Sequence, residues 1–286
     1  MVSKTLIQLF PQPGGEVSLK GLYLKEALFR RGTFEKPFVY GNFLTSLDGR
    51  IALEDEQGVA YTPSSLTTPD DFRLFLELQA QADCLITHGG YLRALEARRL
   101  GNILQVGHHE CGIDLLGWRR QQGLLSQPAV VIASASLDFP LPESLKAHDQ
   151  KVYIATGADA PQDRVTFWRQ QGMEVLVVGR GALVDGDLLT RALGDRGYRT
   201  LYLIAGPQML ETMARESCLS VLFQTMTHQL MGGEVFRTLV PGPILGPFGH
   251  LKLVTLYYDP AGSNGAGQWF SQFQAMNNPS SAGASS

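Results

Sequence analysis

The sequence predicts an α/β fold in which helices flank a mostly parallel sheet. Short apolar runs alternate with amphipathic segments of about ten residues through residues 38–217, a pattern typical of βαβ units. The last two apolar runs, residues 250–258 and 267–273, are joined by the short loop DPAGSNGAG and indicate an antiparallel hairpin. The sheet is therefore expected to be mixed, with this hairpin at its edge.

Residues 1–36 are expected to form an N-terminal arm that precedes the main domain. The arm contains one amphipathic stretch, residues 19–32, in which leucines recur near helical spacing. These are Leu19, Leu22, Leu24 and Leu28. The expected role of the arm is packing or contact with a second copy of the chain.

The strands of the main domain are predicted from short apolar runs that end in turn residues. They are expected at residues 38–45, 83–90, 128–134, 151–156, 174–179, 200–206 and 220–227.

Four helices are expected between these strands, each with a recognisable start or end. Residues 68–82 have Thr68 as the N-cap and Pro69 in the first position, followed by two acids. Helices at 163–172 and 185–197 end at a glycine, and the helix at 207–217 begins with a proline.

Two segments show no clear pattern of helix or strand. Residues 101–123 are rich in Gly and His and are interpreted as a long loop. Residues 274–286 lack large apolar side chains towards their end, so a disordered tail is expected after a main domain at 37–273.

The composition excludes several classes of function. With 44% apolar and 18% charged residues among 286, the chain is of ordinary globular type. A net charge of −3 without a basic block argues against nucleic acid or an anionic membrane as partner. The three cysteines, Cys84, Cys111 and Cys218, lie far apart, which indicates neither a disulfide framework nor a zinc site. Without a secretory or membrane-spanning apolar run, a reducing, cytoplasmic compartment is expected.

Three predicted strands end in polar or glycine-rich turns, NFLTSLDG, DCLITHGG and LYLIAGPQ. Ligands of open α/β sheets bind beyond the C-terminal ends of the strands. A shared ligand site requires these three turns to meet at one edge of the sheet.

The stretch LYLIAGPQML resembles a phosphate-binding turn. Ala205 and Gly206 leave the backbone unobstructed between a strand and a helix, so N–H groups are free to face a phosphate. A plain strand-to-helix turn explains the same residues equally well. The dinucleotide fingerprint G-x-G-x-x-G follows no predicted strand, and the spaced glycines of VVGRGALVDGD at 177–187 open no helix.

The remaining candidate motifs favour structural interpretations. The Asp-Gly pair in NFLTSLDGR is a common turn signal, and this turn is also able to form one wall of a ligand site. His88, after a buried strand, is interpreted as structural more readily than as a proton donor. His108, His109, Glu110 and Cys111 are adjacent and point in different directions, which argues against a metal site. Neither G-x-S-x-G nor a GxxxxGK[ST] loop is present.

Four segments together resemble the riboflavin-biosynthesis pyrimidine reductases. These are PFVYGNFLTSLDGRIAL, SSLTTPDDFRLFLELQAQADCLITHGG, LYLIAGPQML and QLMGGEVF, between about Pro37 and Phe273. The family includes the C-terminal domain of the bifunctional deaminase-reductase RibD and stand-alone enzymes. The resemblance implies a dihydrofolate-reductase-like three-layer fold, a homodimer, and reduction by NADPH of a ribosylamino-pyrimidine 5′-phosphate to its ribitylamino form.

The resemblance also implies a set of site residues. Asn42, Ser46 and Asp48 are expected on the catalytic side of the site. Thr62 and Ser64 match a polar loop on the substrate side. The cofactor-binding residues implied for NADPH are Gly89, Gly90, Ala205, Gly206 and Gln208. No metal ligand is implied.

Some family residues are replaced in this chain. Ile204 and Ala205 stand where the family often has Glu-Gly, and Tyr91 stands where it has Thr. The replacements motivate a second hypothesis, a relative that kept the fold and lost the cofactor. A third hypothesis is a dihydrofolate-type reductase that acts on a pterin.

Overall fold

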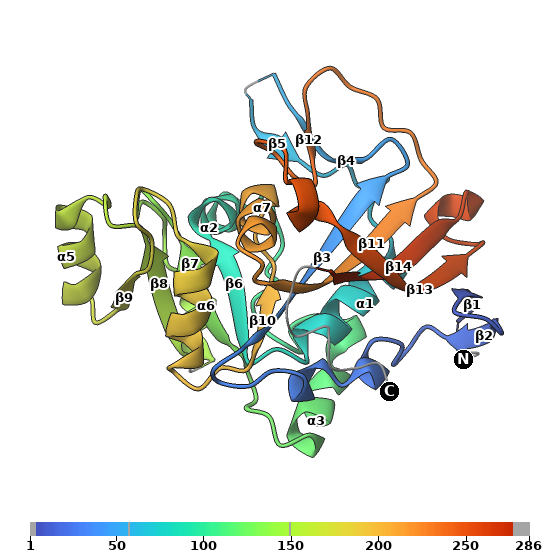
Figure 1. Ribbon diagram of the computed structural model, residues 1–286, viewed down its shortest axis with the longest axis horizontal. Coiled ribbons are helices and arrows are strands. Elements are labelled where there is room, and N and C mark those ends of the chain that lie inside the picture. Colours follow the sequence, from blue (N-terminus) through green and yellow to red (C-terminus); the bar gives the residue numbers. More distant parts are fainter. Residues whose placement is uncertain (1–3, 57, 149, 277–286) are drawn as a thin grey trace.

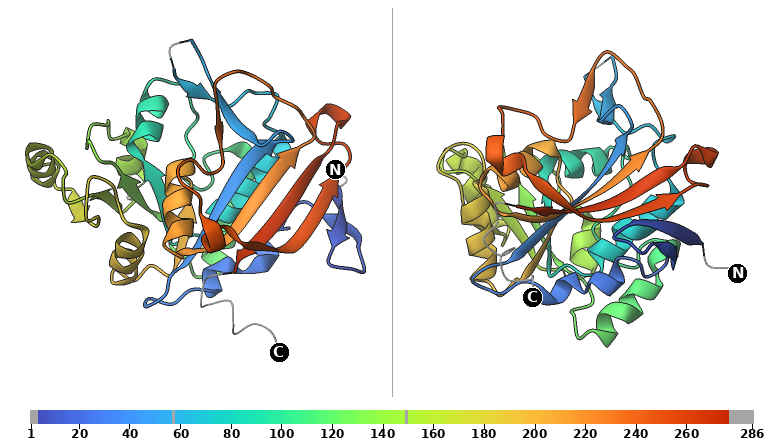
Figure 2. Two further views of the ribbon diagram at one scale, coloured as in Figure 1. Left: turned by 45° about the horizontal axis from the view of Figure 1, so that its top comes forward. Right: turned by 45° about the vertical axis from the view of Figure 1, so that its right-hand side comes forward.

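The computed structural model describes residues 4–56, 58–148 and 150–276, and its central feature is an eleven-stranded twisted sheet with helices on both faces (Figures 1 and 2). The predicted α/β class with a mixed, mostly parallel sheet is confirmed. In spatial order the strands are β2 (Gly15–Ser18), β1 (Thr5–Phe10), β13 (Leu251–Asp259), β14 (Gln268–Ala275), β11 (Leu219–Thr227), β3 (Phe38–Ser46), β10 (Thr200–Leu203), β6 (Cys84–His88), β7 (Ala129–Ala133), β8 (Val152–Thr156) and β9 (Glu174–Val177).

The strands from β11 to β9 are parallel, and helices cover both of their faces. On one face the core includes residues of α1 (Pro69–Gln79), α2 (Gly89–Glu96), α4 (Glu143–Ala147) and α5 (Gln162–Gln170). On the other face it includes residues of α6 (Gly186–Gly194) and α7 (Pro207–Arg215). All four predicted helices and the predicted strands are therefore confirmed as elements, with small shifts at their ends.

The hairpin of β13 and β14 is confirmed, but its expected place at the sheet edge is wrong. Strand β14 pairs with β11 on one side, and β13 pairs with β1 on the other. The N-terminal hairpin of β1 and β2 extends the sheet further, so the edge strand is β2. Pairing between chain ends about 250 residues apart leaves no local sequence signal.

Two other expectations need correction. The amphipathic stretch at 19–32 forms two 3-10 helices, Leu24–Glu26 and Leu28–Arg30, because Gly21 and Ala27 adopt positive φ and interrupt helical geometry. The region 101–123 is not one loop, since it contains a 3-10 helix, Glu110–Gly112, and α3 (Asp114–Gln121), which packs against α1. Two further 3-10 helices span Gly246–Gly249 and Ser263–Gly265.

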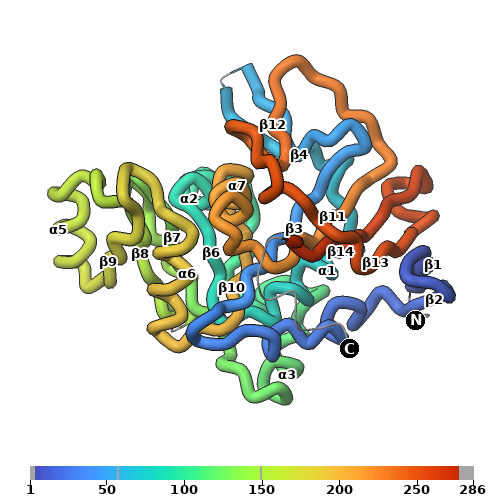
Figure 3. The backbone as a smooth tube through the Cα atoms, in the orientation of Figure 1, coloured from blue at the N-terminus to red at the C-terminus, as the bar shows by residue number. Residues whose placement is uncertain are grey.

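A second, three-stranded sheet stands beyond the C-terminal ends of the parallel strands, as the backbone trace shows (Figure 3). Its strands are β12 (Phe236–Thr238), β4 (Arg50–Glu54) and β5 (Ala60–Tyr61), in that order. Strand β12 comes from the connection between β11 and β13, so two distant parts of the chain meet in this sheet.

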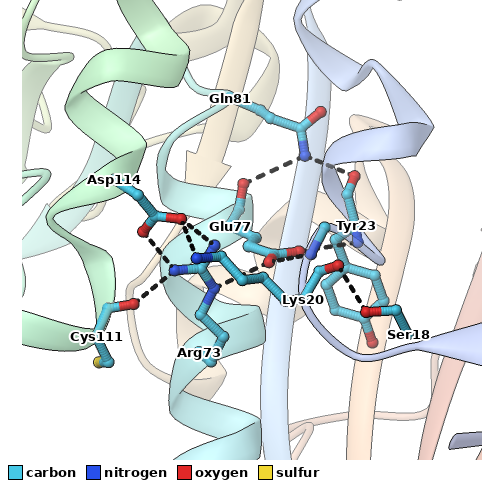
Figure 4. A network of polar contacts seen from close by, with 9 residues as sticks. Ser18, Lys20, Tyr23, Arg73, Glu77, Gln81, Cys111 and Asp114 are labelled. Atoms are coloured by element: carbon cyan, nitrogen blue, oxygen red, sulfur yellow. Dashed lines mark hydrogen bonds and ion pairs between the residues drawn. The ribbon is translucent and has the colours of Figure 1, made fainter. Parts of the chain in front are cut away.

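A buried carboxylate on α1 attaches the N-terminal arm to this helix (Figure 4). Glu77 is fully buried and accepts hydrogen bonds from the backbone N–H groups of Gly21, at 2.6 Å, and Tyr23, at 3.1 Å. It also pairs with Arg73, which in turn binds Asp114 of α3 at 2.7 Å. One ion-pair network therefore connects the arm, α1 and α3.

We expect Glu77→Ala to lower the free energy of unfolding by about 3 kcal/mol, because two backbone donors lose their acceptor and the buried Arg73 guanidinium loses one of its two carboxylate partners. Chemical denaturation measures the change. Glu96→Ala, at an exposed position of α2, is the matched control and should change stability by less than about 0.5 kcal/mol. A loss at residue 77 no larger than the control's would contradict this account.

Residues 274–276 belong to β14 and the turn after it, and the rest of the predicted tail, 277–286, lies outside the described residues. Among the described helices, each is too short or too polar to cross a lipid bilayer.

Candidate functional site

The topology places a crevice between β6 and β10. These two strands are neighbours in the sheet, yet the chain leaves β6 towards β7 and leaves β10 towards β11, in opposite directions. The helices that follow them, α2 and α7, consequently pack on opposite faces of the sheet. Such a switch point is where open α/β sheets bind their ligands.

A pocket of about 1050 Å³ lies at this switch point. Its walls include the ends of β6 and β10, the loop after β7 with Ser134 and Ser136, and residues of the three-stranded sheet. The five residues predicted to bind a cofactor all line it: Gly89, Gly90, Ala205, Gly206 and Gln208. Two turns more than a hundred residues apart in sequence thus form one site.

Both helices that begin at the pocket lack a side-chain cap. The N-cap residues are His88 for α2 and Gly206 for α7. The His88 side chain bonds no first-turn N–H group, and Gly206 has no side chain that could do so. These N–H groups and the positive ends of the helix dipoles suit a bound phosphate. A Cβ on Gly206 would meet only His88, at 3.8 Å, so glycine keeps open the space that a ligand needs. The turns therefore fit a dinucleotide's phosphates.

Two arginines add positive charge to the pocket. Arg93 of α2 and Arg237 of β12 both line it, and both act on His88 between them. Burial, and then the charges of Arg93 and Arg237, lower the pKa of His88 below its usual value. The imidazole is thus neutral at neutral pH, and the positive charge of the site resides on the guanidinium groups.

Asn42 stands where β3 continues beyond β10. The last pair between these strands joins Gly41 to Leu203, whereas β3 runs on to Ser46 with β11 as its neighbour. The Oδ1 atom of Asn42 is buried and has no hydrogen-bond partner among the described residues. Buried polar atoms are rarely left unpaired, so this atom indicates a place for a ligand or water.

Asp71 lies in a cluster of polar groups with Asn42. Both Asp71 Oδ1 and the Tyr202 hydroxyl are buried without a hydrogen-bond partner in the described chain. Burial raises the pKa of Tyr202 well above its usual value; the charge of Asp71 also raises this pKa, and the Asn42 side chain lowers it. The three side chains therefore form one buried polar cluster between α1 and the sheet, here called the Asp71 cluster.

Burial raises the pKa of Asp71 to about 6, despite a hydrogen bond from Thr225 that favours the ionised form. The negative charge of Asp70 contributes to this increase in the pKa. A carboxyl group with a pKa near neutrality is suited to hold or release a proton.

Ser46 and Asp48 are engaged with the turn itself. The Ser46 hydroxyl donates to Asp48 and accepts from the backbone N–H of Arg50, at 3.0 Å. Asp48 also accepts from Met231 and Gly232 and pairs with Arg50. Burial opposes ionisation of Asp48, but these hydrogen bonds and the Arg50 charge hold its pKa well below the usual range. Neither residue lines the pocket.

The two residues predicted to bind substrate lie outside the pocket as well. Thr62 and Ser64 occupy the loop between β5 and α1, where the Thr62 hydroxyl donates to the Ile51 carbonyl at 3.3 Å. The structure therefore brings together the predicted cofactor set and separates it from the predicted substrate set. Of the adjacent histidines, His109 bonds the Asn102 carbonyl and packs on Phe72.

Sequence reasoning missed Asp71, Arg93 and Arg237. A signal existed for Asp71, because it shares a helix face with Leu74 and Leu78, and an acid on an apolar face needs an explanation. For Arg237 no signal existed, since it lies between Gly233 and Gly242 in a segment without periodicity.

Comparison with known proteins identifies a protein family and several proteins that this chain resembles. The sequence model described as the RibD C-terminal domain matches residues 37–259. A 2,5-diamino-6-ribosylamino-4(3H)-pyrimidinone 5′-phosphate reductase of Aquifex aeolicus is 26% identical over 210 residues, which cover 73% of this chain and 84% of the relative.

Solved structures share the fold at lower identity. A pyrimidine reductase-like protein of Corynebacterium diphtheriae matches with a TM-score of 0.62 and 18% identity, over 85% of this chain and 93% of the other. The Saccharomyces riboflavin biosynthesis reductase Rib7 matches with a TM-score of 0.56 and 12% identity, over 90% and 99% of the two chains.

Proposed function

The chain belongs to the RibD C-terminal domain family, and from that membership we propose that it is an NADPH-dependent pyrimidine reductase. It reduces a ribosylamino-pyrimidine 5′-phosphate to the ribitylamino form, as the name of the Aquifex relative suggests. The observation that carries the proposal is the pocket at the switch point, which joins all five predicted cofactor residues.

The chain's own residues hold and orient the two reactants. The uncapped first turns of α2 and α7 bind the phosphates of the dinucleotide, and Gly206 lets the backbone approach closely. When bound, the nicotinamide supplies the hydride. Asn42 lies at the end of the β3–β10 pairing and is assigned to orient the reacting groups.

We assign proton supply to Asp71. When C1 of the opened sugar accepts a hydride, the imine nitrogen must accept a proton. The protonated Asp71 carboxyl, with one oxygen unpaired in the Asp71 cluster, is suited to donate it. Ser46 and Asp48 support the site through the turn, since their hydrogen bonds are internal.

The proposal is tested by the oxidation of NADPH by the purified protein. The substrates are 5-amino-6-(5-phosphoribosylamino)uracil, its 2,5-diamino-pyrimidinone counterpart and dihydrofolate. We expect turnover of at least one ribosylamino substrate, with the ribitylamino product identified by mass spectrometry. Turnover of dihydrofolate alone would replace this function with that of a pterin reductase. No NADPH binding at millimolar concentration would indicate a relative that has lost its cofactor.

The homodimer implied by the family resemblance and the cytoplasmic location expected from the sequence composition stay predictions. The N-terminal hairpin exposes Ile7, Leu9 and Phe10, whose apolar surface is suited to such contact.

A further inference from the structure

The three-stranded sheet supplies one wall of the pocket with a charged side chain. Arg237 of β12 and Glu54 of β4 both line the pocket and pair with each other at 2.9 Å. The Arg237 side chain remains half exposed in this pair. An exposed ion pair is weak, so a ligand with a stronger negative charge is able to replace Glu54 as the ion-pair partner of Arg237.

Arg237 lines the pocket close to the place where the two helix N-termini meet. His88 is the N-cap residue of α2, and its Nε2 atom would lie 3.8 Å from a Cβ on Gly206 at the start of α7. Arg237 acts on this same imidazole, as does Arg93 from α2. Both guanidinium groups therefore lie in the pocket wall and close to the uncapped helix starts.

The position of β12 depends on the turn after β3. Asp48 accepts hydrogen bonds from Met231 and Gly232, while the Arg50 guanidinium lies 4.1 Å from the centre of the Phe236 ring. In β12 itself, Arg237 pairs with Ala52 of β4. The turn thus fixes the segment that carries Arg237, although neither Asp48 nor Arg50 lines the pocket.

We propose that Arg237 and Arg93 bind the diphosphate of the dinucleotide from two walls of the pocket, and that Arg237 exchanges Glu54 for this group on binding. Asp48 is a positioning residue for this subsite, acting through β12. The assignment rests on the proposed cofactor binding. It favours the diphosphate over the 2′-phosphate because both arginines line the pocket together with the two helix starts, where a diphosphate is best neutralised.

The test is calorimetric binding of NADPH and of NADH to the full chain. Because both dinucleotides carry the diphosphate, Arg237→Met and Arg93→Met should each weaken both by about tenfold to hundredfold. Glu54→Gln should strengthen both by a few fold, because the competing carboxylate is gone. Arg191→Met, which removes an exposed arginine of α6 outside the pocket, is the control and should change affinity by less than about twofold.

Asp48→Ala tests the positioning role. It should weaken both dinucleotides, and adding Arg237→Met to it should weaken them little further, because both changes remove the same contact. Full additivity would overturn the role of Asp48.

Three results would overturn the diphosphate subsite. The first is a loss of affinity for NADPH alone in the arginine variants, which would place a 2′-phosphate there. The second is unchanged dinucleotide affinity in both arginine variants. The third is weaker dinucleotide binding by Glu54→Gln. Absence of dinucleotide binding by the unaltered protein would instead overturn the proposed function, and the subsite with it.

Discussion

Asp71→Asn is expected to lower kcat by about a hundredfold to ten-thousandfold, the range that a positioned general acid contributes. The substitution keeps the shape of the side chain in the Asp71 cluster and removes its acidic proton. NADPH affinity should stay within about threefold, because Asp71 lies outside the pocket at the helix starts. Steady-state kinetics with calorimetric binding separates the two effects.

The pH dependence gives a second readout for Asp71. With a pKa of about 6, the carboxyl loses its proton as the pH rises, so kcat of the unaltered protein should fall above pH ~6. The Asp71→Asn variant should lose this limb of the profile. A limb that persists in the variant would assign proton supply to another group.

In Asp71→Asn, the free energy of unfolding at alkaline pH should rise while kcat falls. The Asp71 pKa is about 6 when folded and ~3.9 when unfolded, so the folded chain binds the proton more tightly. The stabilising effect is full below pH ~4 and is lost as the pH rises through ~6. Asp71→Asn should therefore stabilise the protein at pH 8, by up to about 3 kcal/mol, and much less at pH 4.

Asp70→Asn is the matched control on the same helical turn. Asp70 pairs with Lys4 of the arm, so its loss should cost stability and leave kcat within a few fold. A similar loss of kcat in both variants would mean that the helix start, and not the Asp71 proton, supports turnover.

The sequence predicts the repeated units of this fold well, because each is encoded locally. Thr68 and Pro69 mark the start of α1, and the Thr68 hydroxyl indeed accepts from the Asp71 N–H at 3.1 Å. Gly172 and Gly197 follow α5 and α6 with positive φ. The glycine turns after β6 and β10 share one pocket because parallel strands end at the same sheet edge.

What the sequence does not predict depends on contacts between distant segments. The N-terminal hairpin lies beside β13 through pairs such as Ile7 with Tyr258, which no local pattern encodes. The helix α3 escapes prediction because only Leu115 and Arg119 on it are buried, too few for a clear apolar stripe. The position of Ser46 and Asp48 outside the pocket could not be predicted for a related reason, since their residue types suit a turn and a ligand equally well.

Gly206→Val is expected to weaken NADPH binding by at least about a hundredfold without unfolding the protein. The backbone at Gly206 has φ −72°, a value open to any residue, so the substitution introduces no backbone strain. The added Cβ meets only His88, at 3.8 Å, so the valine side chain projects into the pocket. It therefore occupies the space through which a phosphate reaches the first turn of α7.

The control for this prediction is Gly15→Val, on the edge strand β2. A Cβ there meets no atom within 4 Å, as at an open surface, and the residue is far from the pocket in the fold. Both variants should melt within a few degrees of the unaltered protein, and only Gly206→Val should lose NADPH. Unchanged affinity in Gly206→Val would show that the dinucleotide does not approach the start of α7. Because Gly206 is less crowded than Gly89 and Gly90, the two glycines at the start of α2, that result would count against the whole assignment of the pocket to a cofactor.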